Sequence, residues 1–161
     1  MFVIIFILVL IFLFLMGRLL DWEAERVIHQ LYTRDDKGVI SGSETVHHEA
    51  NHKKALIVIH SFLESPEIFQ NLISEVVQRN EFDLFVPLLP YHGRNLKVAR
   101  QLNNITVLDF LEEYLSALLS KYQHVTLLGY SYGGALLVDL ARRGKIPANV
   151  NLILYAPSIF I

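Results

Sequence analysis

The stretch LLGYSYGGALLVDL, from Leu127 to Leu140, decides how the chain is expected to fold. The apolar run over residues 124–130 predicts a buried strand, and the apolar residues over 135–143 predict a helix. Residues 129–133 between them match G-x-S-x-G, a pattern typical of a tight strand-to-helix turn. The pattern therefore predicts that Ser131 projects from a strained turn at a helix N-terminus, where backbone N–H groups favour negative charge.

Apolar runs elsewhere in the chain extend this strand-and-helix pattern. Further strands are expected at residues 55–60, 82–90 and 151–157, and further helices after Ser65-Pro66 and after Thr106. Ser65 is expected to cap the first of these helices, and Thr106 with Asp109 to form a capping box at the second. Because strands alternate with helices, an α/β fold is expected, with a parallel sheet covered on both faces and chemistry at the carboxyl ends of its strands.

The N-terminal segment is strongly apolar. Residues 2–16 form an unbroken apolar run, and the first charged side chain is Arg18. A membrane-spanning helix needs about 20 residues, so residues 1–20 suffice. A cleaved signal peptide, the alternative, would show a basic start and a small-residue cleavage site, and this segment has neither. We expect an uncleaved single-pass anchor over residues 1–20 and a juxtamembrane segment over 21–38.

Charge and composition narrow the classes of partner. The 161 residues carry a net charge of −2 and contain no cysteine, which excludes disulfides and thiolate metal sites. Since no basic cluster is visible, nucleic acid is not an expected partner. The basic residues nearest the anchor all follow it, which favours a cytoplasmic body; they are Arg18, Arg26, Arg34 and Lys37.

Three motifs together carry a resemblance to a known family. IVIHSFLESP, FVPLLPYHGRN and LLGYSYGG follow one another in the chain. In this order they resemble the N-terminal half of an α/β-hydrolase of the carboxylesterase and monoacylglycerol-lipase-like group, over Val39 to Pro157. The resemblance implies a partial α/β-hydrolase domain over residues 39–161 and Ser131 as the nucleophile. It also implies an oxyanion hole formed by the backbone N–H groups of Phe62 and Tyr132, with Gly129 and Gly133 as the glycines of the turn.

Two of the motifs depart from the family's usual form. The group typically has H-G-F in the first loop and G-H-G in the second. Here the loops contain His60-Ser61-Phe62 and Tyr91-His92-Gly93. A serine in place of glycine at position 61 reduces backbone freedom beside the expected oxyanion donor.

The triad partners of Ser131 are missing from the sequence. In this fold an aspartate or glutamate and then a histidine follow the nucleophile, but residues 141–161 contain none of these. Asp139 is expected to face solvent or pair with an arginine. His60 and His92 are alternative bases, or else they only stabilise their loops. We therefore expect an incomplete hydrolase whose apolar last strand lies near an exposed sheet edge, prone to associate with another chain.

A second motif competes with the serine turn. His48-Glu49-Ala50-Asn51-His52 matches H-E-x-x-H, the zinc metalloprotease pattern, which requires a helix and a third ligand. The surrounding residues show no apolar stripe that would dock a helix, so a polar turn is expected here and no metal site.

These observations predict a serine hydrolase acting on acyl esters, without a cofactor, at a membrane. Two expectations about partners accompany it: a small acyl ester substrate, and a second polypeptide that completes the fold. The main alternative is a non-catalytic hydrolase-like remnant or interaction module, and a zinc metalloprotease using His48 and His52 is a third hypothesis.

Overall fold

The structure is a computed structural model that describes residues 2–158. Met1 and residues 159–161, the outer ends of the predicted segments 1–20 and 39–161, lie outside the described residues. The elements in chain order are α1 (Phe2–Leu31), β1 (Val46–His48), β2 (Lys54–Ile59), the 3₁₀ turn η1 (Pro66–Phe69), α2 (Gln70–Arg79), β3 (Asp83–Val86), α3 (Leu96–Ala99), α4 (Asn104–Lys121), β4 (His124–Tyr130), α5 (Tyr132–Arg142) and β5 (Asn151–Tyr155).

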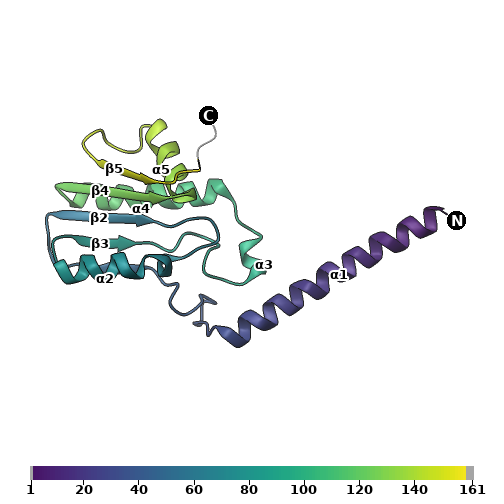
Figure 1. The fold of residues 1–161 in the computed structure, drawn as a ribbon. Coiled ribbons are helices and arrows are strands. Elements are labelled where there is room, and N and C mark those ends of the chain that lie inside the picture. Colours follow the sequence, from purple (N-terminus) through teal and green to yellow (C-terminus); the bar gives the residue numbers. More distant parts are fainter. Residues whose placement is uncertain (1, 159–161) are drawn as a thin grey trace.

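The strands form one mostly parallel sheet, as the sequence predicts. Its five strands lie in the order β1-β3-β2-β4-β5, and β3, β2, β4 and β5 run parallel (Figure 1). Ile59 pairs with Gly129, and Tyr130 pairs with Tyr155. This register aligns the carboxyl ends of β2, β4 and β5, where Ser131 follows its strand.

A short strand, β1, lies in the segment before β2 where a polar turn was expected. Val46 to His48 pair antiparallel with β3, so His48 ends an edge strand. The pairing depends on β3, which is distant in sequence, and no local pattern indicates so short a strand. β3 is also shorter than predicted, because regular pairing stops at Val86, before the two prolines.

Helices cover the two faces of the sheet, and side-chain alternation along β2 assigns the faces. Ala55, Ile57 and Ile59 belong to the core formed with α4 and α5. Val58 packs with Leu84 of β3 and Val76 of α2 on the opposite face. The period of two in β2 therefore gives two apolar layers, one on each side of the sheet.

Helix α1 extends away from the body and buries none of its residues (Figure 1). It is 30 residues long, with a mean hydropathy of 3.0 over its most apolar part, and it is long and apolar enough to cross a membrane. The boundary predicted for the anchor, at residue 20, lies within this helix. The helix continues to Leu31, so the predicted anchor and much of the juxtamembrane segment form one helix.

Two predicted helix caps are wrong. α4 begins at Asn104, and the side chain of Asn103 accepts the Ile105 N–H at 2.9 Å. Thr106 and Asp109 therefore lie inside the helix rather than at a capping box. Ser65 precedes a 3₁₀ turn instead of α2 and makes no capping hydrogen bond through its side chain. Asparagine is at least as good an N-cap residue as threonine, so the local sequence alone did not decide between Asn103 and Thr106.

Candidate active site

Ser131 lies on the turn between β4 and α5 with φ 50° and ψ −111°. A positive φ is strained for any residue with a Cβ, at a cost of about 1–3 kcal/mol. Backbone hydrogen bonds hold the residue on both sides. Its N–H donates to the Tyr155 carbonyl at 2.9 Å, and its carbonyl accepts the N–H groups of Ala135 and Ser158 at 3.1 and 3.2 Å. Pairing with β5 and the first turn of α5 together fix this conformation.

The glycines around Ser131 allow the strand, the helix and the neighbouring loop to approach closely. A Cβ on Gly129 would lie 2.6 Å from the Cα of Gly134. A Cβ on Gly133 would lie 2.4 Å from the carbonyl oxygen of Ile59. These distances are shorter than carbon–carbon and carbon–oxygen contacts allow, so side chains at these positions would push α5 away from the sheet.

Phe62 and Tyr132, the two residues expected to form an oxyanion hole, lie side by side. Their rings meet edge to face with centroids 5.8 Å apart. Tyr132 is the first residue of α5, so its N–H has no acceptor within the helix and is free to bind a ligand. The first loop has its positive φ at Leu63 rather than at Ser61. Serine therefore occupies position 61 without the backbone strain that glycine would relieve.

His60 bridges the first two loops. Its Nε2 accepts the N–H of Leu89 at 3.0 Å, so Nδ1 carries the proton and donates to the Ser61 carbonyl at 2.9 Å. Burial lowers the pKa of His60 to about 4, against the contact with Ser61, which raises it, while the nearby His92 lowers it further. Both ring nitrogens are occupied, so His60 is a neutral structural residue here.

His92 packs among the aromatic rings beside the turn. Its ring stacks on Tyr132 with centroids 6.2 Å apart and meets His60 at 5.1 Å. Nδ1 lies 2.8 Å from the Pro90 carbonyl, and burial lowers the pKa of the imidazole. Nε2 is buried and has no partner among residues 2–158.

Ser158 is the neighbour of the Ser131 hydroxyl. The two Oγ atoms lie 3.1 Å apart, and within the described chain no other hydrogen-bond partner of the Ser131 hydroxyl is present. A second hydroxyl does not act as a base near neutral pH. No local sequence pattern indicates that Ser158 is a neighbour of Ser131, because only the pairing of β4 with β5 brings it there. Asp139 pairs with Arg143 at 2.7 Å on the surface of α5, as expected from the sequence.

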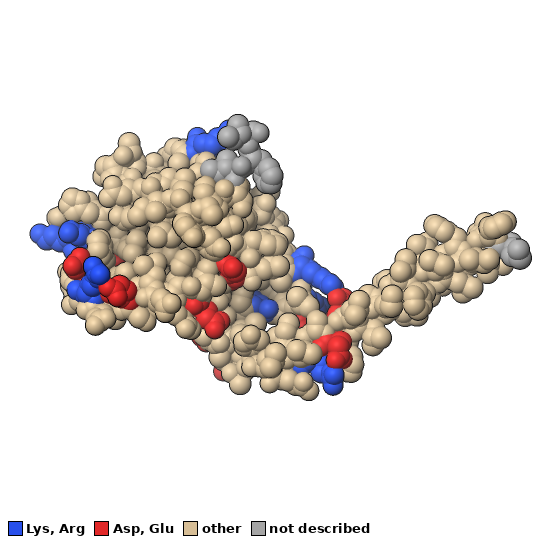
Figure 2. Space-filling view, in the orientation of Figure 1, with Lys and Arg blue, Asp and Glu red and all other residues tan. Residues whose placement is uncertain are grey.

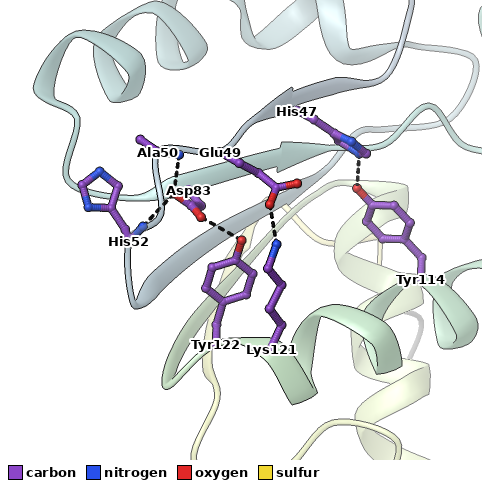
Figure 3. Close-up of polar contacts among 8 residues, drawn as sticks. All are labelled: His47, Glu49, Ala50, His52, Asp83, Tyr114, Lys121 and Tyr122. Atoms are coloured by element: carbon purple, nitrogen blue, oxygen red, sulfur yellow. Dashed lines mark hydrogen bonds and ion pairs between the residues drawn. The ribbon is translucent and has the colours of Figure 1, made fainter.

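Glu49, Ala50 and His52 of the H-E-x-x-H segment have structural partners instead of a common site (Figure 3), whereas the buried Nε2 of His48 has no hydrogen-bond partner among residues 2–158. Glu49 pairs with Lys121, and the His52 ring contacts the Asn80 side chain at 3.1 Å. Asp83 accepts the N–H groups of Ala50 and His52 and the hydroxyl of Tyr122, all at 2.8–3.1 Å.

The two histidines of that motif lie on a strand end and a loop, not on one face of a helix. The zinc hypothesis therefore loses the geometry on which it depends. Among residues 2–158, no three His, Asp or Glu side chains gather in a way that could hold a metal ion.

Comparison with solved structures shows that the chain shares its fold with several known proteins. It resembles a structure from work on LipS and LipT, two metagenome-derived lipolytic enzymes, with a TM-score of 0.59 and 21% identity, covering 71% of this chain and 46% of that one. It resembles MenH from S. aureus with a TM-score of 0.54 and 27% identity, covering 70% and 41%. A marine microorganism esterase gives a TM-score of 0.50 and 19% identity, covering 68% and 40%.

The chain thus spans less than half the length of each of these structures. None of the curated proteins matches it. A sequence profile of the alpha/beta hydrolase fold matches residues 54–151, which is more than half of the chain and includes β2, the serine turn and the start of β5. Together with the sheet order and the turn at Ser131, this match shows that the chain belongs to the alpha/beta hydrolase fold family.

Proposed function

We propose that the chain is the membrane-anchored part of a serine hydrolase that cleaves acyl esters, with Ser131 as its nucleophile. The observation that carries this proposal is the positive φ of Ser131 at the end of β4. Such strain persists where the surrounding structure enforces it, typically at a functional residue. An inert connection between a strand and a helix would gain stability by placing glycine there.

In the proposed reaction, Ser131 Oγ attacks the ester carbonyl carbon while a base takes the hydroxyl proton. The N–H groups of Phe62 and Tyr132 stabilise the resulting oxyanion. The bond to the alcohol breaks, the base returns the proton to the leaving alkoxide, and the acyl group remains on Ser131. Water activated by the same base then releases the carboxylic acid and restores the serine.

The base and its orienting acid are proposed to come from polypeptide that is not among these 161 residues. Two observations support this. His60 uses both ring nitrogens for backbone contacts. In addition, β5 is an edge strand of the sheet that residues 2–158 form, and its Leu152 and Ile153 are 37% and 48% exposed, so within the described chain this edge is available to further strands or to a second polypeptide.

The proposed substrate class follows from the position of α1. The carboxyl ends of the strands, where Ser131 lies, point toward the side of the body from which α1 extends (Figure 1). If α1 spans the bilayer, the serine turn faces the membrane surface, where long apolar acyl groups are available. The basic residues that follow the apolar run favour a cytoplasmic body.

The alternative is a non-catalytic hydrolase-like module, favoured by the single hydroxyl neighbour of Ser131 in the described chain. Ester hydrolysis by membranes from cells that produce the protein distinguishes the two functions. We expect activity that increases with acyl chain length and is lost in Ser131→Ala but kept in Ser158→Ala, a matched loss of one hydroxyl. Equal activity of wild type and Ser131→Ala would refute the nucleophile, and no preference for longer chains would refute the substrate class.

A further inference from the structure

A cavity of about 360 Å³ lies where α1 meets α3. It lies beside the point at which α1 joins the body, where acidic and basic side chains gather, whereas the outer part of α1 has none (Figure 2). Its walls are formed by Arg18, Asp21, Trp22, Glu25, Leu96, Lys97 and Arg100. One wall is therefore the segment of α1 that follows its apolar run, and the other is α3.

The two acidic residues of this cavity already have partners. The Arg100 guanidinium donates to Asp21 with one contact at 2.6 Å, which ties α3 to α1. Glu25 accepts the Leu96 N–H at 2.7 Å and pairs with Arg34 at 3.3 Å. These contacts join the walls of the cavity and neutralise its negative charges.

Two basic residues of the cavity remain, Arg18 and Lys97. The Arg18 guanidinium lies near enough to Asp21 to help the hydrogen-bonded Arg100 lower the pKa of that carboxyl. Neither Arg18 nor Lys97 forms an ion pair within residues 2–158, although both line the cavity, one on each wall. Arg18 and Lys97 thus bring a guanidinium and an ammonium to one cavity, and such donors suit an anion with several oxygen acceptors. The unpaired charge therefore favours a phosphate group over a neutral ligand.

The position of the cavity along α1 indicates where such a phosphate would come from. At about 1.5 Å per residue, the helix from Phe2 to Leu20 spans about 28 Å, close to the hydrocarbon thickness of a bilayer. Arg18 and Trp22 then lie at headgroup level. Trp22 is 61% exposed there, and tryptophan is enriched at membrane interfaces.

We propose that the cavity between α1 and α3 binds the phosphate of an anionic phospholipid headgroup, held by Arg18 and Lys97 and bordered by Trp22. This proposal rests on the membrane-spanning role of α1. Because α3 follows the carboxyl end of β3, a lipid bound here would hold the carboxyl ends of the strands, where Ser131 lies, against the membrane surface. The site thus deepens the proposed function by fixing how the hydrolase body is oriented.

Trp22 is the single tryptophan of the chain and so reports on this cavity directly. We would reconstitute the full chain in phosphatidylcholine nanodiscs with a minor fraction of bromine-labelled phosphatidylglycerol or, separately, bromine-labelled phosphatidylcholine. From the usual contribution of a basic residue near a membrane surface, Arg18 and Lys97 together should give a preference for the anionic lipid on the order of thirtyfold. We therefore expect stronger quenching of Trp22 by brominated phosphatidylglycerol than by brominated phosphatidylcholine.

Variants of basic residues distinguish binding in this cavity from a general attraction of the protein to anionic lipid. The excess quenching should disappear in Arg18→Gln/Lys97→Gln, persist in Arg18→Lys/Lys97→Arg, and persist in Lys53→Gln, which removes one exposed charge from the chain just before β2. Equal quenching by both lipids in the wild type, or an excess that survives in Arg18→Gln/Lys97→Gln, would overturn the site. The excess quenching would also be measured after addition of inorganic phosphate or of chloride at equal ionic strength. If phosphate removes the excess and chloride does not, the cavity binds soluble phosphate, and the proposed lipid ligand is wrong. No quenching by either lipid would refute the membrane position of α1 as well.

Discussion

Gly133, at the start of α5, lies so close to Ile59, at the end of β2, that a Cβ at position 133 would approach the Ile59 carbonyl oxygen to 2.4 Å. This contact joins the helix that follows Ser131, the proposed nucleophile, to the strand that precedes the first loop. It therefore sets the distance between Tyr132 and Phe62, the two proposed oxyanion donors. The geometry of the candidate site depends on a position that has no side chain.

Gly133→Ala should lower the free energy of unfolding by about 1–3 kcal/mol, because α5 must move away from β2 to accommodate the methyl group. Thermal unfolding in detergent, followed by near-ultraviolet circular dichroism, measures the loss. Gly17→Ala is the matched control, since a Cβ there meets no atom within 4 Å. Equal melting of both variants would show that the contact with Ile59 is not tight.

Ser131→Gly should raise the free energy of unfolding by about 1 kcal/mol, because glycine adopts a positive φ without strain. Ser131→Ala also removes the hydroxyl but keeps the Cβ, and it should leave stability nearly unchanged. The difference between the two variants in urea unfolding isolates the backbone strain from the loss of the hydroxyl. If Ser131→Gly is no more stable than Ser131→Ala, the turn at Ser131 does not carry the backbone strain assigned to it.

Stability should fall as pH decreases from about 6.5 to about 4, because the pKa of His60 is lowered to about 4 by burial. The unfolded chain, with an ordinary histidine pKa, binds more protons in this window, so unfolding is favoured as pH falls. A shift of this size corresponds to about 3 kcal/mol. The pH dependence of urea unfolding measures it.

His60→Gln should be less stable at neutral pH and should show a flatter pH dependence over the same window. A wild-type slope in His60→Gln would assign the acid sensitivity to another group.

The proposed cytoplasmic body can be tested with a single cysteine, because the chain has none. Asp36→Cys places a thiol on the exposed chain just after α1. A membrane-impermeant maleimide should fail to label it in intact cells and should label it after lysis. Labelling of Asp36→Cys in intact cells would show that the body lies on the opposite side of the membrane.

The sequence was sufficient for the features that depend on neighbouring residues. The apolar runs predicted β2, β4, α5 and β5 to within a few residues, since alternation and helical spacing are local. The G-x-S-x-G pattern predicted a tight turn at residue 131, where the structure has its positive φ.

Features that depend on distant residues were missed or misplaced. β1 forms only because β3 offers an edge, and Ser158 reaches Ser131 only through the pairing of β4 with β5. α4 starts at Asn104, before the start predicted near Thr106, because the side chain of Asn103 caps the helix. The contacts of α1 with α3 also join segments far apart in the sequence, and no local pattern predicted them.

The reactivity of the Ser131 hydroxyl tests most directly whether Ser131 is an activated nucleophile. Membranes from cells that produce the protein would be treated with a fluorophosphonate, which forms a covalent bond with activated serine hydroxyls, and the adduct would be located by peptide mass spectrometry. We predict a single adduct on Ser131 that is absent in Ser131→Ala and retained in Ser158→Ala. No adduct on Ser131, under conditions in which other serine hydrolases of the same membranes are labelled, would contradict the account and leave a non-catalytic hydrolase-like module.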